Sequence, residues 1–276
     1  MIEIGTTATL AIKKLGPDGA TLDGQNLGEV LVTGRELPPT AAQGGTLTVF
    51  LYRDSENVLT GSTSPPKAQR GECALMEVVT VTPFGAFVDW GLPKDLLVPS
   101  SEQTTPFEEG RSYVILVYLD ELTGRLAGSA KLHSHLSEDG TGFTPGQEVD
   151  LLVSGSSTLG YKAVIDQTHL GLIYHDDAPA KLRPGERRKG YIKEIREDKK
   201  INLSLLPPGL SGVDMLADRI LVHLAVRGGT SELTDKSPPD AIAKAFGASK
   251  KAYKKALGRL YKQRLIRIHP DRIMLL

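Results

Sequence analysis

The sequence predicts a mainly β protein that ends in a smaller α+β module. Glycine and proline are frequent, at 29 and 17 of 276 residues, and this frequency of turn residues favours short strands over helical bundles. One order of strand signals occurs three times, at a period of roughly 65 to 75 residues, and the residues after 206 change to helical periodicity. We therefore expect three tandem five-stranded barrels followed by a helical module.

Each repeat carries five strand signals in the same order. An alternating strand introduced by glycine is followed by a second glycine-led strand, a third apolar strand, a long fourth strand and a short fifth. The first four strands are expected to start near 5, 19, 28 and 45, then 71, 85, 95 and 111, then 146, 160, 170 and 186. The closing strands are "VLTGS", "RLAGS" and "INLSL". Five strands in a small Greek-key barrel are typical of the OB-fold, which we expect over 1–64, 67–132 and 144–207.

The C-terminal module, expected over 212–276, combines three helices with a hairpin. Apolar residues at helical spacing predict the first helix in "VDMLADRILVHLAV" from 213. Ser237 is expected to cap the second helix, over "SPPDAIAKAF", and Ser249 the third, over "KKAYKKALGRLYKQ". The remaining "RLIRIHPDRIMLL" predicts two strands around a His-Pro-Asp-Arg turn. This order of elements is typical of a winged helix-turn-helix.

The third predicted helix pairs an apolar stripe with a basic face. Tyr253, Ala256, Leu257 and Leu260 recur at the spacing of a buried face. Much of the rest is cationic: Lys250, Lys251, Lys254, Lys255, Arg259 and Lys262. Phosphates dominate the affinity for nucleic acid, and lysine is a point charge that reads bases poorly, so we expect phosphate contacts through Lys250, Lys251, Lys254, Lys255 and Arg259. The alternative is a solvated lysine face on a protein-binding winged helix.

The net charge of zero hides an asymmetry along the chain. Residues 1–180 hold 11 Lys and Arg against 23 Asp and Glu, a net charge of −12, whereas residues 181–276 hold 22 against 10, a net charge of +12. Such an asymmetry favours contact between the C-terminal third and a polyanion. The alternative is that the two ends offset each other for solubility.

The most basic stretch of the third repeat is "KLRPGERRKGYIKEIREDKK" at 181–200, with nine cations and four acids. Strand alternation places Lys189, Tyr191 and Lys193 on one face. Cations that follow phosphates beside rings that stack on bases form the usual pattern of single-strand recognition. The alternative is a surface strand whose cations pair with neighbouring acids.

The second repeat resembles an S1-type RNA-binding domain of the OB class. The resemblance rests on "PFGAFVDW" at 83–90, on a strand that ends at Asp120, and on "RLAGS" from Arg125, and it departs at Pro99, where that family has histidine. It implies a nucleic-acid face of Phe84, Phe87, Asp120 and Arg125. The matching positions of the third repeat include Lys162, Tyr174 and Lys200, whereas the first repeat has no aromatic or cation there and is expected to be structural or protein-binding.

With the basic stretch, the predicted RNA-binding residues are Phe84, Phe87, Asp120, Arg125, Lys162, Tyr174, Arg187, Arg188, Lys189, Tyr191, Lys193 and Lys200. The chain as a whole resembles the conserved virulence factor B family of bacterial cytoplasmic RNA-binding proteins, most specifically in "DKSPPDAIAKAFGASKKAYKKALGRLYKQRLI" at 235–266. The resemblance implies RNA binding and regulation of gene expression without catalysis.

No catalytic or metal motif accompanies these features. The G-x-S-x-G, Walker lysine and G-x-G-x-x-G patterns are missing, and the single Cys73 excludes a disulfide framework and thiolate zinc clusters within one chain. His133 and His135 lie in a polar linker, and Asp176 and Asp177 are adjacent residues that point in different directions. We therefore expect no catalytic residue, metal or cofactor.

Three classes of partner stay open. Single-stranded RNA is the first. The second is duplex nucleic acid bound through the winged helix, which would make the protein a DNA-binding transcription regulator. The third is the ribosome or RNA polymerase, bound by a non-catalytic interaction scaffold. There is no long apolar run, and "MIEIGTTATLAIKK" alternates like a strand, so we expect no membrane partner and a cytoplasmic location.

Overall fold

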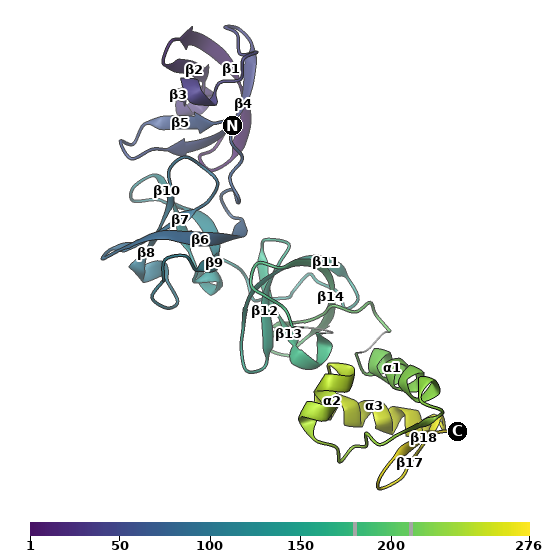
Figure 1. Ribbon diagram of the computed structural model, residues 1–276. Coiled ribbons are helices and arrows are strands. Elements are labelled where there is room, and N and C mark those ends of the chain that lie inside the picture. The colour runs from purple at the N-terminus through teal and green to yellow at the C-terminus, as the bar shows by residue number, and fades with distance from the viewer. Residues whose placement is uncertain (179–180, 210–211) are drawn as a thin grey trace.

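A computed structural model describes residues 1–178, 181–209 and 212–276 as an elongated row of four modules (Figure 1). Three β modules follow one another from the N-terminus, and the helical module lies at the opposite end. The predicted fold class is confirmed, while the residue boundaries between modules stay a prediction. Within the described ranges, no helix has both the length and the apolar character needed to span a bilayer.

The first module is a closed barrel with strand order β1-β2-β3-β5-β4. Its strands are β1 (Thr7–Gly16), β2 (Gly19–Asp23), β3 (Glu29–Thr33), β4 (Thr46–Arg53) and β5 (Leu59–Ser62). Inward residues alternate along β2 and β3, so Leu22 and Val30 are fully buried and meet Leu51 of β4 in one core. All five strands confirm the predicted order.

The second module has five strands in the order β10-β9-β6-β7-β8. They are β6 (Cys73–Thr82), β7 (Gly85–Asp89), β8 (Leu96–Pro99), β9 (Ser112–Asp120) and β10 (Arg125–Ser129). Unlike its neighbours, this sheet is not closed by a hydrogen-bonded ladder, because β8 and β10 lie at its two edges. Side chains join these edges: a Cβ placed on Gly128 would lie 2.8 Å from Val98 Cγ2.

The third module is again a closed barrel, ordered β11-β12-β13-β15-β14. It comprises β11 (Glu148–Ser156), β12 (Gly160–Ile165), β13 (His169–Tyr174), β14 (Arg187–Ile195) and β15 (Ile201–Ser204). The pairing of β13 with β15 is parallel and the other pairings are antiparallel. Ile165, Ile173 and Leu203 fill the core.

The C-terminal module contains the predicted helices and hairpin plus one short strand that the sequence did not reveal. Its elements are α1 (Gly212–Val226), β16 (Thr230–Ser231), α2 (Pro239–Phe246), α3 (Lys250–Lys262), β17 (Ile266–Ile268) and β18 (Ile273–Leu275). The predicted α3 stripe of Tyr253, Ala256, Leu257 and Leu260 is buried against α1 and α2.

Two predicted helix caps in this module have different outcomes. Ser249 Oγ accepts a hydrogen bond from the Ala252 N–H, which confirms it as the α3 cap. Ser237 does not cap α2: its hydroxyl accepts from the Thr234 N–H instead, and Pro238 occupies the cap position. Pro239 follows at the first helical position, where the fixed φ of proline suits the start of a helix.

The first two modules share an aromatic contact. Phe50 and Tyr52 of β4 pack edge-on against Trp90, which follows β7, with ring centroids 5.6 and 6.3 Å from the tryptophan. Trp90 is 3% exposed, and its indole N–H donates to the Lys94 carbonyl at 2.6 Å. The only tryptophan therefore lies in the junction between modules, where it can stack on no ligand.

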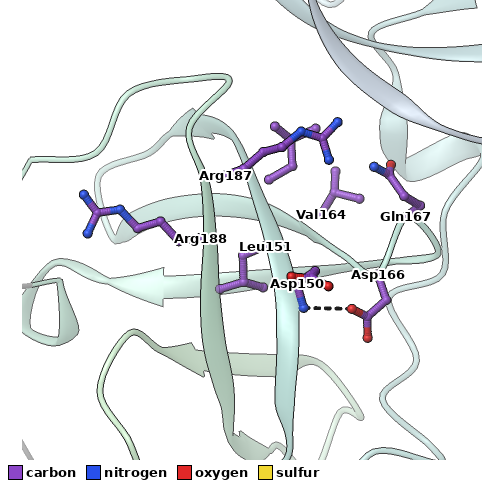
Figure 2. Close-up of a pocket in the computed structure, with 8 residues that line it drawn as sticks. Asp150, Leu151, Val164, Asp166, Gln167, Arg187 and Arg188 are labelled. Atoms are coloured by element: carbon purple, nitrogen blue, oxygen red, sulfur yellow. Dashed lines mark hydrogen bonds between the residues drawn. The ribbon is translucent and has the colours of Figure 1, made fainter. Parts of the chain in front are cut away.

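The second and third modules are joined at Cys73. The side-chain amide oxygen of Gln167 accepts a hydrogen bond from the Cys73 N–H at 2.7 Å. On the other side of the same residue, Arg187 Nη2 donates to the Cys73 carbonyl at 3.1 Å. Gln167 adopts φ +60°, a conformation that L-residues adopt at a cost, and its side chain makes this contact across the junction. A cavity of about 380 Å³ opens here, and Figure 2 shows Arg187 and Arg188 pointing in opposite directions from one strand.

Replacing Gln167 with glycine should loosen this junction. Glycine adopts the positive φ freely, so the change removes only the side-chain amide. We expect the Cys73 amide proton to exchange roughly fivefold faster, since one hydrogen bond is worth about 1 kcal/mol net. Hydrogen exchange measured by NMR tests this, with Gln167→Glu as the control that keeps an acceptor oxygen. Equal exchange in the glycine variant would contradict the contact.

Candidate nucleic-acid interface

Phe84 and Phe87 form one exposed aromatic pair. Phe84 lies in the turn before β7 and is 61% exposed, and Phe87 lies on β7, half-buried. Their ring centroids are 6.1 Å apart at an interplanar angle of 88°. Because Phe84 belongs to the turn and only Phe87 to the strand, strand alternation does not send the two rings to opposite faces.

Gly85 makes this arrangement sterically possible. A Cβ at that position would lie 2.5 Å from the Val98 carbonyl oxygen on β8, closer than any side chain tolerates. The glycine therefore permits the close approach of β7 to β8, and the two aromatic side chains project beside it. The pair is a candidate stacking surface for flat ligands.

Asp120 and Arg125, which the S1 resemblance places beside this pair, are engaged elsewhere. The Asp120 carboxylate accepts from the Leu122 N–H at 3.1 Å and from the Thr123 hydroxyl at 2.8 Å within its own turn. The Arg125 guanidinium donates to the Ser55 carbonyl of the first module. This contact directs the Arg125 guanidinium to the junction with the first module.

The surroundings of the aromatic pair carry little positive charge. Residues 67–132 hold 6 Lys and Arg against 9 Asp and Glu, a net charge of −3. Lys67 is ion-paired with Asp89 at 2.7 Å. The second module therefore exposes two aromatic rings but carries little charge that would attract phosphates over a distance.

The predicted basic strand of the third module is largely neutralised by its own barrel. Lys189, Tyr191 and Lys193 do face outward, since Gly190 and Ile192 between them are buried. Lys189 Nζ lies 2.9 Å from Asp150, and this hydrogen bond raises the pKa of the Lys189 amine. The other two outward residues also contact acids from other elements. Tyr191 Oη donates a hydrogen bond to Glu148 at 3.3 Å, and Lys193 Nζ forms an ion pair with Asp177 at 2.7 Å.

The other predicted cations of this module follow the same trend. Arg188 pairs with Glu186 and Lys200 with Glu138, at 2.5 and 3.0 Å. Residues 144–207 hold 10 Lys and Arg against 9 Asp and Glu, a net charge of +1. Lys162 on β12 and Tyr174 at the end of β13 are diagonal neighbours on one face, because Gly160 pairs with Tyr174 and Lys162 with Leu172. The third module as a whole is therefore almost neutral, although its sequence contains a basic run.

The positive charge resides in the winged helix. Residues 212–276 hold 13 Lys and Arg against 6 Asp and Glu, a net charge of +7. Lys251, Lys254 and Lys255 are exposed on α3, and Lys254 lies 4.0 Å from Asp235. Two predicted contacts are used within the module: Lys250 Nζ donates to the Lys236 carbonyl, and Arg259 pairs with Asp214 of α1.

Further exposed groups extend this surface beyond the predicted residues. Tyr261 is 58% exposed near the end of α3, and Lys262, Arg264 and Arg267 follow it with no ion pair to the described parts of the chain. The sequence signal that points to Tyr261 and Lys262 is helical spacing, because they lie seven residues, or two turns, after Lys254 and Lys255.

The single cysteine and the potential metal ligands are the groups most relevant to catalysis. Cys73 is completely buried, and burial raises the pKa of its thiol to about 12, so it lies far from the thiolate form that reacts. Within 1–178, 181–209 and 212–276, no three His, Cys, Asp or Glu side chains are placed to hold a metal ion.

Known families match both ends of the chain. The CvfB-like winged helix domain matches residues 218–275, and the S1 domain matches residues 4–64. The S1 match therefore falls on the first module, where the motif resemblance was weakest. S1 and winged helix domains both support a nucleic-acid partner, without distinguishing RNA from DNA.

Similar proteins occur in several bacteria. The uncharacterized protein YitL of Bacillus subtilis is 30% identical over 268 residues, which cover 94% of this chain and 89% of the relative. Conserved virulence factor B of Staphylococcus epidermidis is 27% identical and covers 82% of this chain and 78% of the relative. A crystal structure of a Streptococcus pneumoniae multidomain protein with nucleic acid binding domains is 26% identical, covers 99% of this chain and 98% of that one, and has a TM-score of 0.42.

Proposed function

Because the chain belongs to the conserved virulence factor B family, with an S1 domain and a CvfB-like winged helix domain, we propose that it binds single-stranded RNA without catalysis. We further propose that it acts in the regulation of gene expression in the bacterial cytoplasm. The observation that carries the proposal is the exposed pair of Phe84 and Phe87, since rings of this kind stack on unpaired bases.

The proposed binding surface has two parts with different physical roles. The net charge of +7 in the winged helix supplies most of the attraction to phosphates, through Lys251, Lys254 and Lys255 of α3. The aromatic pair adds stacking in an acidic module. Lys162 and Tyr174 form a smaller patch in the third module, while Lys189, Lys193 and Lys200 would first have to exchange their carboxylate partners for phosphates.

A second candidate function is supported by the winged helix itself. A basic helix on a helix-turn-helix is the element that enters the major groove of duplex DNA. In that case the protein would be a transcription regulator and the β modules would be accessory. A third function, a scaffold on the ribosome or RNA polymerase, would need neither surface to bind free nucleic acid.

Competition binding distinguishes these functions. The intact protein is titrated into a labelled single-stranded RNA at about 150 mM salt and then challenged with unlabelled RNA or duplex DNA of equal length. We expect RNA to compete better. A stronger effect of duplex DNA would make the protein a DNA-binding regulator, and no binding of either would favour the scaffold.

Removing charge from α3 should lower the salt dependence of binding. With Lys254, Lys255 and Lys262 all changed to glutamine, the slope of log K against log salt should fall by about 2, since each lost phosphate contact on a single strand removes about 0.7. A salt titration by fluorescence anisotropy measures this slope. The matched control changes three cations of the first module, Lys13, Lys14 and Arg35, to glutamine in the same way. It should leave the slope unchanged. A slope that stays the same in both variants would remove α3 from the interface.

A further inference from the structure

Gly258 lies in the interior of α3, and no packing contact in the fold requires a glycine at this position. Glycine in a helix interior destabilises the fold, because a glycine loses more backbone conformational freedom on folding than an alanine does. Such a glycine is usually retained because a neighbour approaches closely, as at Gly160, where a Cβ would lie 2.0 Å from the Ile173 carbonyl oxygen. At Gly258 a Cβ would meet nothing within 4 Å. The protein itself therefore has room for a side chain at this position.

The groups around Gly258 all face solvent. One turn before it lie Lys254 and Lys255, and one turn after it lie Tyr261 and Lys262, at the spacing of neighbours on a helix surface. All four side chains are exposed, and Tyr261 is 58% exposed. The missing Cβ leaves bare helix backbone between three ammonium groups and one aromatic ring.

We propose that this notch seats one nucleotide of single-stranded RNA. The backbone of the RNA lies against Gly258, its phosphates lie within reach of Lys254, Lys255 and Lys262, and an unpaired base stacks on the Tyr261 ring. Positive charge on three sides selects a polyanion, and the free ring selects a strand whose bases are not already paired. The inference rests on the proposed RNA binding and adds the place on α3 where the strand lies.

The proposal predicts effects of opposite sign on stability and on binding. Gly258→Ala should raise the thermal midpoint of the winged helix by a few degrees, because alanine favours the helix and meets no neighbour. The same methyl group should weaken binding of single-stranded RNA by about tenfold, which corresponds to the partial loss of one stacked base. Calorimetry and fluorescence anisotropy on the full chain measure the two effects.

Three further variants make the test specific. Val222→Ala, on the exposed face of α1, also raises helix propensity and should leave RNA affinity unchanged. Gly258→Lys adds a cation to the same surface: if binding depended on charge alone it would tighten, whereas an occupied notch makes it weaken. Tyr261→Ala should weaken binding by a similar factor to Gly258→Ala.

Each outcome bears on the proposal. A higher midpoint with unchanged RNA affinity in Gly258→Ala overturns the notch, while binding by the unaltered protein shows that the proposed function stands. If Gly258→Ala loses more affinity for duplex DNA than for single-stranded RNA, the notch binds a duplex and the single-strand proposal is overturned. If the unaltered protein binds no RNA, the proposed function and the notch fail together.

Discussion

Changing both Phe84 and Phe87 to alanine should weaken binding of single-stranded RNA by about 30-fold or more. Each stacked base contributes roughly 1–3 kcal/mol, so two lost contacts cost at least about 2 kcal/mol. The thermal midpoint should stay within a few degrees, because Phe84 is mostly exposed and Phe87 is only half-buried. Fluorescence anisotropy gives the affinity and circular dichroism the midpoint.

Two exposed valines of β6, Val79 and Val81, provide the matched control. Their replacement by alanine removes apolar surface from the same sheet without removing a ring, and RNA affinity should stay unchanged. A large fall in the midpoint of the phenylalanine variant would show that the rings belong to the core. Equal affinity in both variants would show that the pair stacks on no base.

Trp90→Ala should lower the free energy of unfolding by about 3–5 kcal/mol, the range for a buried aromatic replaced by alanine. The indole fills the space between the first two modules and contacts Phe50 and Tyr52 of β4. The effect should therefore reach the first module, and amide exchange in β4 should become faster. Hydrogen exchange together with thermal denaturation measures both parts of this prediction.

Trp90→Phe is the corresponding control, because it keeps a ring in the junction and loses the hydrogen bond to the Lys94 carbonyl. Its effect on stability should be clearly smaller than that of alanine. If Trp90→Ala changes exchange only in the second module, the two modules are not coupled through this contact.

Much of the fold follows from local patterns. Alternating apolar residues between glycine-led turns predict all fifteen barrel strands, and helical spacing predicts the buried face of α3. The two-residue β16 escaped prediction because so short a strand shows no alternation, and it forms by pairing with β18. Closure of the barrels also depends on contacts between distant segments, and it differs in the second module.

The candidate site was less predictable. The S1 resemblance placed Phe84 and Phe87 on one face, and their rings do lie side by side in the structure. The partners of the cations were not predicted: Lys189 meets Asp150 on a neighbouring strand, and Arg125 reaches Ser55, 70 residues earlier in the chain. A count of charges along the sequence assigned attraction to everything from residue 181 onward, whereas the net positive charge lies mainly in the winged helix, with +7 over 212–276 against +1 over 144–207.

By itself, the sequence determined the repeat of β modules, the winged helix, the aromatic pair and the lysine face of α3. These features depend on residues close together in the chain, whose spacing of two or three to four positions sets which side chains share a surface. Only the tertiary structure decided which charges remain available and which modules are joined through Trp90 and Cys73. Strand pairing and module contacts bring together groups as far apart as Cys73 and Arg187, separated by 114 residues, and no local pattern contains that information.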